Sequence, residues 1–423
     1  MTRPAKSFIF RIVLQVFSNI KIGVFIAAVN FLIQGISFFV QNFIAKNLGH
    51  SEYGFFGLLQ TDYSIFCSIA DFGMSTLILA FFGYRATSGT LFKNVLQLRL
   101  ICTMTTAVIM AIFAIVARHD HPIFYGELIL TFGLLFQHAF FDWYFICGKF
   151  WKKLFLSKLL HSISYMTIMG FALLYLKVNK IEYIALSMVI AALPAFFFGV
   201  SQSINTSLLR FTRQTFHFVA LMLKAGVPYA ISGFATFAYI PVGLYVADRF
   251  ASAEFLSAYN FGHKILILCS GIMVHFISSN LVNQHQSKDK NIHIKEILIF
   301  TAFIATCSIP LWLFPSQFLQ LFFFAVNWTE DSLSCSAAIL RILSFTLLFQ
   351  AARTSMISGL LKNKAVWTYA IIVSSAGLCN VVACTSAGML LPNSYIPLFA
   401  LTGDAVISVL LLVHYLRRGA LHW

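Results

Sequence analysis

A row of polar residues in the second half of the chain has the types and spacing of an anion-binding surface on a helix. The residues recur every three or four positions, so they share one helix face; they are Ser257, Asn260, Lys264, Gly271, His275 and Ser279. A lysine near the end of an apolar segment can instead extend its ammonium to the lipid headgroups. That role does not require polar residues below it on the same face, so we expect Lys264 to face a polar interior.

Other charged residues in or near apolar segments are candidates for binding a coupling ion or a substrate. His138 and Asp142 are four residues apart, so a helix would place them on one face as a titratable pair; a structural bond between helices is the alternative. Asp404 lies deep in an apolar segment, where an unpaired ionised carboxylate is costly, and it is a second coupling-ion candidate. The residues near segment ends, which contact either a substrate or the helix ends, are Asp71, Arg341 and Arg353.

The composition predicts that membrane-spanning helices position these residues. Of the 423 residues, 59% are hydrophobic and 10% are charged, and the mean hydropathy is +0.84. A spanning helix needs about 20 mostly apolar residues. Twelve stretches qualify, at residues 22–44, 54–82, 98–117, 125–147, 154–176, 183–203, 226–247, 258–281, 297–316, 336–360, 366–388 and 395–416. We expect an interfacial amphipathic helix before the first of them and an all-α integral membrane protein.

The distribution of basic residues predicts the orientation in the membrane. The formal net charge is +15, but the basic residues concentrate on one side of the predicted topology, as cytoplasmic loops do. The opposite side holds Lys46, Arg118, Lys177, Lys180 and Arg249. This asymmetry predicts that both termini are cytoplasmic and argues against a nucleic-acid partner.

The chain contains an internal repeat. KIGVFIA at residues 21–27 matches KAGVPYA at 224–230, and AKNLGHSEYGFF from residue 45 matches ADRFASAEFLSA from residue 247. The repeat predicts two six-helix lobes, residues 1–210 and 211–423, around a central cavity, related by a pseudo-two-fold axis along the membrane normal.

The repeat also predicts a gate between the two lobes. An offset of about 202 residues, set by the matched segments, places Asp62 opposite Lys264 at a similar depth. We expect these two side chains either to pair across the axis or to pair separately, each within its own lobe. Pro228 and Pro241 both fall in the seventh apolar stretch, where they permit either a gating hinge or a static kink.

The sequence also argues against several other functions. No loop is long enough for a catalytic domain, and there is no phosphate-binding G-x-x-x-x-G-K-[ST] loop, H-E-x-x-H or paired C-x-x-C. His119 and His121 are expected to lie in a solvated loop rather than to bind a metal. The eight cysteines fall mostly within apolar stretches and read as small apolar residues. We expect no enzyme activity, cofactor or metal.

Four segments resemble a known family. NLGHSEYGFFGLLQTDYSIFCSIADFGM (47–74), AFFDWYFICGKF (139–150), LKAGVPYAISGF (223–234) and SAYNFGHKI (257–265) are similar, in this order, to the second, fourth, seventh and eighth helices of polysaccharide flippases. These belong to the multidrug/oligosaccharidyl-lipid/polysaccharide exporter superfamily, and the Wzx-type O-antigen flippases are the most similar group. Leu256 and Ser257 depart from the family pattern, which usually has a glycine before the tyrosine.

The resemblance implies a function. A flippase of this kind moves an undecaprenyl-pyrophosphate-linked oligosaccharide repeat unit from the cytoplasmic to the outer leaflet of a bacterial inner membrane by alternating access. It implies a coupling cation, proton or sodium, and association with polysaccharide polymerase machinery. A pyrophosphate and sugar hydroxyls need a polar cavity, because unsatisfied polar groups are costly in hydrocarbon. The residues expected to bind substrate or form the gate are Asp62, Asp71, Lys264, His275 and Arg341; the coupling-ion candidates are His138, Asp142 and Asp404.

Three alternatives remain at the level of sequence. An ion-coupled antiporter of drugs or small cations, from the same superfamily, would favour acidic over basic residues in the cavity. A lipid II flippase normally has two helices more than the twelve predicted here, and the length of this chain hardly allows them. A membrane glycan polymerase or ligase would be expected to carry a large outer loop.

Overall fold

The structure is a computed structural model, and it describes most of the chain. The described residues are 33–81, 89–203, 213–237, 241–284, 292–293, 306, 308–350, 356, 360, 365–417 and 421–422. The expected N-terminal interfacial helix, the start of the first apolar stretch and Arg353 lie outside these residues.

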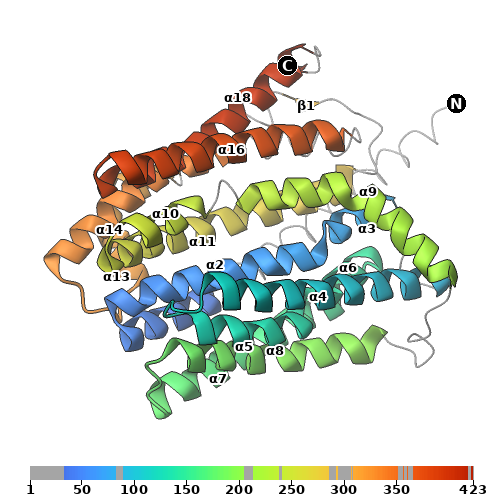
Figure 1. The fold of residues 1–423 in the computed structure, drawn as a ribbon, viewed down its shortest axis with the longest axis horizontal. Helices are drawn as coiled ribbons and strands as arrows, with labels where there is room; N and C mark the ends of the chain where they lie inside the picture. Colours follow the sequence, from blue (N-terminus) through green and yellow to red (C-terminus); the bar gives the residue numbers. More distant parts are fainter. Residues whose placement is uncertain are drawn as a thin grey trace, which may run out of the picture.

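The described part of the first half is a bundle of long helices (Figure 1). A helix covers residues 33–48. It is followed by α2 (His50–Asp71), α3 (Met74–Phe81), α4 (Gly89–Ala117), α5 (Phe124–Leu135), the 3₁₀ turn η2 (His138–Phe141), α6 (Asp142–Cys147), α7 (Trp151–Gly170), the π-helical turn η3 (Phe171–Tyr175) and α8 (Ile181–Ser203).

The second half contributes a similar series of helices and one short strand pair. The elements are α9 (Arg213–Phe237), α10 (Val242–Phe250), α11 (Ala253–Gln284), β1 (Ile292–His293), α13 (Pro315–Phe322), α14 (Glu330–Leu343), α16 (Val366–Leu390), η5 (Asn393–Tyr395), α17 (Ile396–Ala400), α18 (Thr402–Arg417) and β2 (Leu421–His422). The two-residue strands pair in parallel, with Ile292 opposite Leu421. Residues 308–313 and 345–350 are also helical.

The architecture confirms the predicted fold class, an all-α integral membrane protein. Within the described ranges, eight helices are long and apolar enough to cross a membrane. Many large apolar side chains on these helices are exposed, as lipid contact requires; examples are Val108, Ile112, Val116, Leu378 and Val382. The exposed surface of these helices is therefore compatible with contact with lipid rather than with water.

Two of the expected spans are interrupted helices. The stretch at 125–147 divides into α5, η2 and α6, with Gln137 in an extended conformation at the break. The rings of Phe140 and Phe141 pack against Phe196 there. The stretch at 226–247 divides into α9 and α10, and Pro241 precedes the first residue of α10. Proline lacks the backbone N–H that a continuous helix would use, so the break falls where the sequence predicts a kink.

The two halves of the chain meet along α2. In Figure 1, α4, α5, α7 and α8 form one side and α14, α16 and α18 the other, with α2, α9, α10 and α11 between them. Helix α2 packs against α4 and α5 of its own half and against α9, α10 and α11 of the other half. Residues that reach across this line of contact therefore join the two halves.

Candidate functional site

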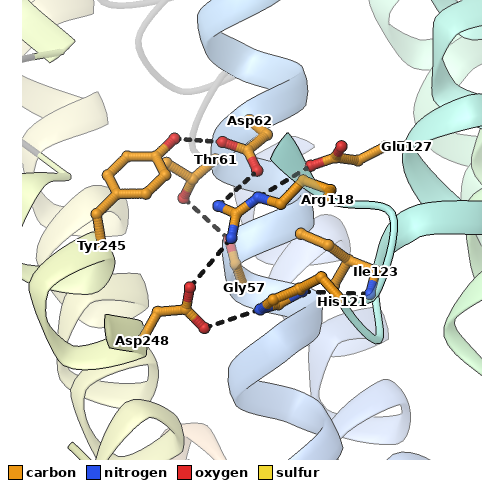
Figure 2. Close-up of polar contacts among 9 residues, drawn as sticks. All are labelled: Gly57, Thr61, Asp62, Arg118, His121, Ile123, Glu127, Tyr245 and Asp248. Atoms are coloured by element: carbon orange, nitrogen blue, oxygen red, sulfur yellow. Dashed lines mark hydrogen bonds and ion pairs between the residues drawn. The ribbon is translucent and has the colours of Figure 1, made fainter. Parts of the chain in front are cut away.

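The structure gathers charged side chains around Arg118, which directly follows α4. Its Nη1 lies 3.1 Å from Asp248 Oδ2, its Nη2 lies 3.4 Å from Asp62 Oδ2, and its Nε lies 3.8 Å from Glu127 Oε1 (Figure 2). One guanidinium therefore faces three carboxyl groups. We call Arg118, Asp62, Glu127 and Asp248, together with His121 and Tyr245, the Arg118 network.

The Arg118 network is largely removed from solvent. The side chains of Arg118 and Asp248 are 11% and 12% exposed, that of Asp62 is 3% exposed and that of Glu127 is fully buried. The Tyr245 hydroxyl donates a hydrogen bond to Asp62 Oδ1. Neither carboxyl oxygen of Glu127 has a hydrogen-bond partner among the described residues. Charges buried in this way need close opposite charges.

The Arg118 network joins the two halves of the chain. Asp62 lies on α2, Arg118 at the end of α4, and Glu127 in the first turn of α5, whereas Tyr245 and Asp248 lie on α10. His121, in the turn between α4 and α5, places its Nε2 3.1 Å from Asp248 Oδ1. The ion pairs to Asp248 therefore connect the first half to the second.

Asp248 lies beyond the apolar stretch that ends at residue 247. Burial acts to raise the pKa of its carboxyl group, but hydrogen bonds and charges from His121 and Arg118 lower it, and the net result is a pKa below the usual value. Asp248 is therefore ionised at neutral pH in this conformation.

Lys264 lines a cavity of about 340 Å³ between the halves. Its ammonium donates a hydrogen bond to Gln60 Oε1 on α2. The cavity is lined by Gln34, Ser37, Phe38, Gln41, Gln60, Thr61, Tyr63, Ser64, Met188, Pro241, His263, Lys264, Ile267 and Leu268. Side-chain amides and hydroxyls supply most of the polar groups, and Lys264 supplies a positive charge.

Contacts between the halves lie beyond the cavity along α2 in both directions. Towards the start of α2, Asn260 Nδ2 donates to the Tyr53 carbonyl at 2.9 Å. A Cβ added at Gly57 would lie 2.2 Å from the Asn260 side chain, and a Cβ added at Gly54 would lie 2.8 Å from the Ser257 backbone nitrogen, so glycine at these positions allows the helices to approach this closely. Beyond the other end of α2, a Cβ at Gly73 would lie 2.5 Å from Tyr229 Cβ on α9.

The structure does not join Asp62 to Lys264. Asp62 contacts Arg118 and Tyr245, and Lys264 contacts Gln60, among the described residues. The predicted direct pair is therefore absent from this conformation. Asp62 follows the alternative of a charge partner in its own half, whereas Lys264 reaches across to the other half.

The other predicted site residues near helix ends have local partners. Asp71 pairs with Arg99 at 2.8 Å and accepts a hydrogen bond from Ser75 at 2.6 Å. Arg341 is exposed and donates from Nε to the Trp312 carbonyl at 3.2 Å. The structure gives these residues roles at helix ends, and their contact with a substrate remains a prediction.

The coupling-ion candidates lie at separate places. Asp142 pairs with Lys158 at 3.5 Å, and the break before α6 means that its four-residue spacing from His138 does not correspond to one α-helical turn. Asp404 is 3% exposed, near the start of α18. The side chains of His138 and His275 lie outside the part of the chain that the structure describes.

Sequence reasoning missed most of the Arg118 network. The sequence predicts that Arg118 lies on the outer side, that Asp62 belongs to a gate and that His121 is solvated, and it gives no signal for Glu127 or Asp248. His121 is instead 20% exposed and bonded to Asp248. Glu127 lies in the first turn of α5, where an acidic residue has an ordinary local role, and Asp248 lies near the end of α10. What distinguishes Asp248 is its pairing with Arg118 and His121, more than a hundred residues away, which the sequence does not show.

Comparison with known proteins identifies the family. Residues 21–282 match the family model described as polysaccharide biosynthesis protein. None of the curated protein sequences matches this chain.

Solved structures share the fold. An inward-facing multidrug resistance MATE family transporter of the MOP superfamily has a TM-score of 0.73 at 13% identity, over 92% of this chain and 95% of that chain. The lipid II flippase MurJ, in an inward closed conformation, also has a TM-score of 0.73, at 14% identity, over 94% and 88% of the two chains. An outward-facing MATE family transporter has a TM-score of 0.65 at 13% identity, over 95% and 96%.

These matches bear out the resemblance noted in the sequence. The family model covers more than half of the chain, and the fold agrees over nearly all of it. The chain therefore belongs to the polysaccharide biosynthesis protein family and is a multi-pass membrane protein with the fold of the MOP-superfamily transporters and flippases.

Proposed function

We propose that this protein flips a lipid-linked oligosaccharide, joined to its polyprenyl carrier through pyrophosphate, from the cytoplasmic to the outer leaflet of a bacterial inner membrane. The product would serve O-antigen or another surface polysaccharide. The polyprenyl tail stays in lipid, and only the polar head enters the cavity. Both chain termini would then be cytoplasmic, and the Arg118 network would lie towards the outer side.

The charge of the cavity carries this proposal. Lys264 contributes an ammonium, and no carboxylate lines the cavity among the described residues. An ammonium attracts pyrophosphate, and glutamine, serine and threonine side chains match sugar hydroxyls. A small-cation or drug antiporter would need the opposite charge in the same place, so the cavity favours the flippase.

The contacts between the halves support alternating access. The cavity lies between the contact at Gly57 and the contact at Gly73. Opening one contact at a time would expose the cavity to one side of the membrane, as rocking of two lobes does. The higher TM-scores to inward-facing and inward closed structures than to an outward-facing one agree with a conformation closed on the outer side. A coupling cation, proton or sodium, would drive the cycle.

The test is to delete the gene and follow lipid-linked repeat units. Surface polysaccharide should disappear while the repeat units persist on the cytoplasmic leaflet, where an impermeant glycan-modifying reagent does not reach them in intact cells. Wild-type protein should restore export. If no repeat units were made in the deletion strain, the protein would act in synthesis and the proposal would be wrong.

Lys264→Gln tests the anion site within the same assay. We expect it to reduce export at least tenfold at normal protein levels, since losing a charged hydrogen bond of about 1.5–3 kcal/mol corresponds to roughly 10- to 150-fold. Lys180→Gln is the matched control, because Lys180 is exposed at the start of α8. Full export in Lys264→Gln would remove this residue from substrate binding.

A further inference from the structure

The Arg118 network has more negative than positive groups. Three carboxyl groups face one guanidinium, and the arginine is permanently protonated. With all three carboxyls ionised and His121 neutral, a buried cluster would carry a net charge of −2. When two carboxylates share a buried site, their repulsion makes it costly for both to be ionised, which favours a proton on one of them.

The geometry shows which groups would share a proton. Asp62 and Glu127 are the two more deeply buried carboxyls, and both lie beside the same guanidinium, 3.4 Å from Arg118 Nη2 and 3.8 Å from Arg118 Nε. Asp248 is held ionised by His121 and Arg118. Figure 2 shows Asp62 and Glu127 on adjoining sides of the guanidinium, with Asp248 below it.

Among the described residues, the charged and titratable groups that face Glu127 all belong to the Arg118 network. The charged and titratable groups around it are Asp62 from α2, Arg118 from the end of α4, His121 from the turn, and Tyr245 and Asp248 from α10. Helix α8 packs on this part of α5 with the apolar side chain of Ile181 beside Gly126.

We propose that the Arg118 network is a proton-binding site, in which one proton shared by Asp62 and Glu127 is taken up when the two halves close at this end of the molecule. Closure brings Asp248 and Tyr245 of α10 against the charges of the first half and excludes water. Both changes make ionised Asp62 and Glu127 costlier together. Opening withdraws Asp248, admits water and returns the proton to the aqueous phase on that side; only an O–H bond forms or breaks.

The sign of the pH dependence follows by linkage. The closed state binds one more proton than the open state, so its population rises as pH falls, by up to about tenfold in the closed-to-open ratio per pH unit. The equilibrium between closed and open states is that of the protein without substrate, so it is separate from transport of the lipid-linked sugar.

The experiment measures closure directly in the full-length protein in lipid nanodiscs without substrate. Spin labels at cysteines replacing Glu52 and Glu254, exposed in the first turns of α2 and α11, report the separation of the halves by double electron–electron resonance. Wild type should shift towards the short distance as pH falls from 8 to 5. Glu127→Gln, which imitates the protonated carboxyl, should stay closed at both ends of this range.

Matched variants make the result decisive. Glu182→Gln changes a carboxyl near the start of α8, outside the network, and should keep the wild-type response. Asp62→Asn should also flatten the response, and it serves if Glu127→Gln does not fold. His121→Gln should keep most of the response; its complete loss there would identify the imidazole as the switch and overturn the proposal.

The remaining outcomes also bear on the proposal. An unchanged pH response in Glu127→Gln, or no response in wild type, would overturn the proton site. Neither result would affect the flippase proposal, which depends on the fate of lipid-linked repeat units in cells.

Discussion

Arg118 provides most of the positive charge that makes the buried carboxyls of its network tolerable. It contacts Asp62, Glu127 and Asp248, and it lies 5.9 Å from the centre of the Phe113 ring. The planar guanidinium can address several carboxylates at once, which a lysine ammonium on a flexible stem does less well. One side chain therefore holds together three carboxyl groups from both halves of the chain.

Replacing Arg118 should destabilise the protein. Arg118→Gln leaves the carboxyls of Asp62 and Glu127 buried without their cation, and breaking such a buried pair typically costs about 3–5 kcal/mol. We expect a clear fall in the melting temperature of the purified protein, with partial recovery in Arg118→Lys. Arg341→Gln, at an exposed arginine, should change it little. Equal melting temperatures for Arg118→Gln and wild type would show that the network does not stabilise this conformation.

At the scale of the element, the crossing of α2 and α11 depends on small residues. Gly54 and Gly57 are three residues apart and face Leu256, Ser257 and Asn260 of α11. Small residues at a helix interface allow close approach in a membrane, where association relies on packing and interhelical hydrogen bonds. The Asn260 hydrogen bond to the Tyr53 carbonyl is formed because the two backbones come this close.

Gly57→Leu should therefore hold the molecule open at this crossing. Its Cβ would lie 2.2 Å from the Asn260 side chain, which would have to move and lose its hydrogen bond to the Tyr53 carbonyl. The rest of the leucine side chain is expected to push the two helices apart. With spin labels at the positions of Glu52 and Glu254, we expect the short-distance population to be lost at every pH and export to fail. Gly170→Ala is the control, because nothing lies within 4 Å of a Cβ there. A distance distribution like that of wild type would show that the crossing accommodates the side chain.

At the scale of the whole molecule, the asymmetry of basic residues predicts one orientation. Cysteines introduced at Ser51 and Asn393 in a cysteine-free protein should react with an impermeant maleimide from outside intact cells, whereas one at Gln214 should react only after the membrane is opened. Ser51 lies in the first turn of α2, and Gln214 lies in the first turn of α9. Labelling of Gln214→Cys in intact cells would overturn the orientation, and with it the assignment of the Arg118 network to the outer side.

The amino-acid sequence is enough to predict the membrane class, the fold and the family. Apolar stretches of about 20 residues are the length that a helix needs to cross the hydrocarbon of a membrane. The order of the four matched segments predicts the same family that the match over residues 21–282 shows. The sequence predicts that Lys264 faces a polar interior, since a charge at that depth needs a reason, and in the structure Lys264 lines a cavity with glutamine, serine and threonine side chains.

The partners of the charged residues become visible only when the helices are packed together. Arg118 and Asp248 are 130 positions apart, and Lys264 and Gln60 are 204 apart. In a soluble protein, the polar face of a helix is exposed to water and the apolar face is buried, so the sequence shows which side of the helix packs against its neighbours. Here both the lipid-facing and the core-facing sides are apolar, so hydropathy does not predict which helices are neighbours. The Arg118 network depends on which helices are neighbours, and its residues come together because the two halves pack along α2.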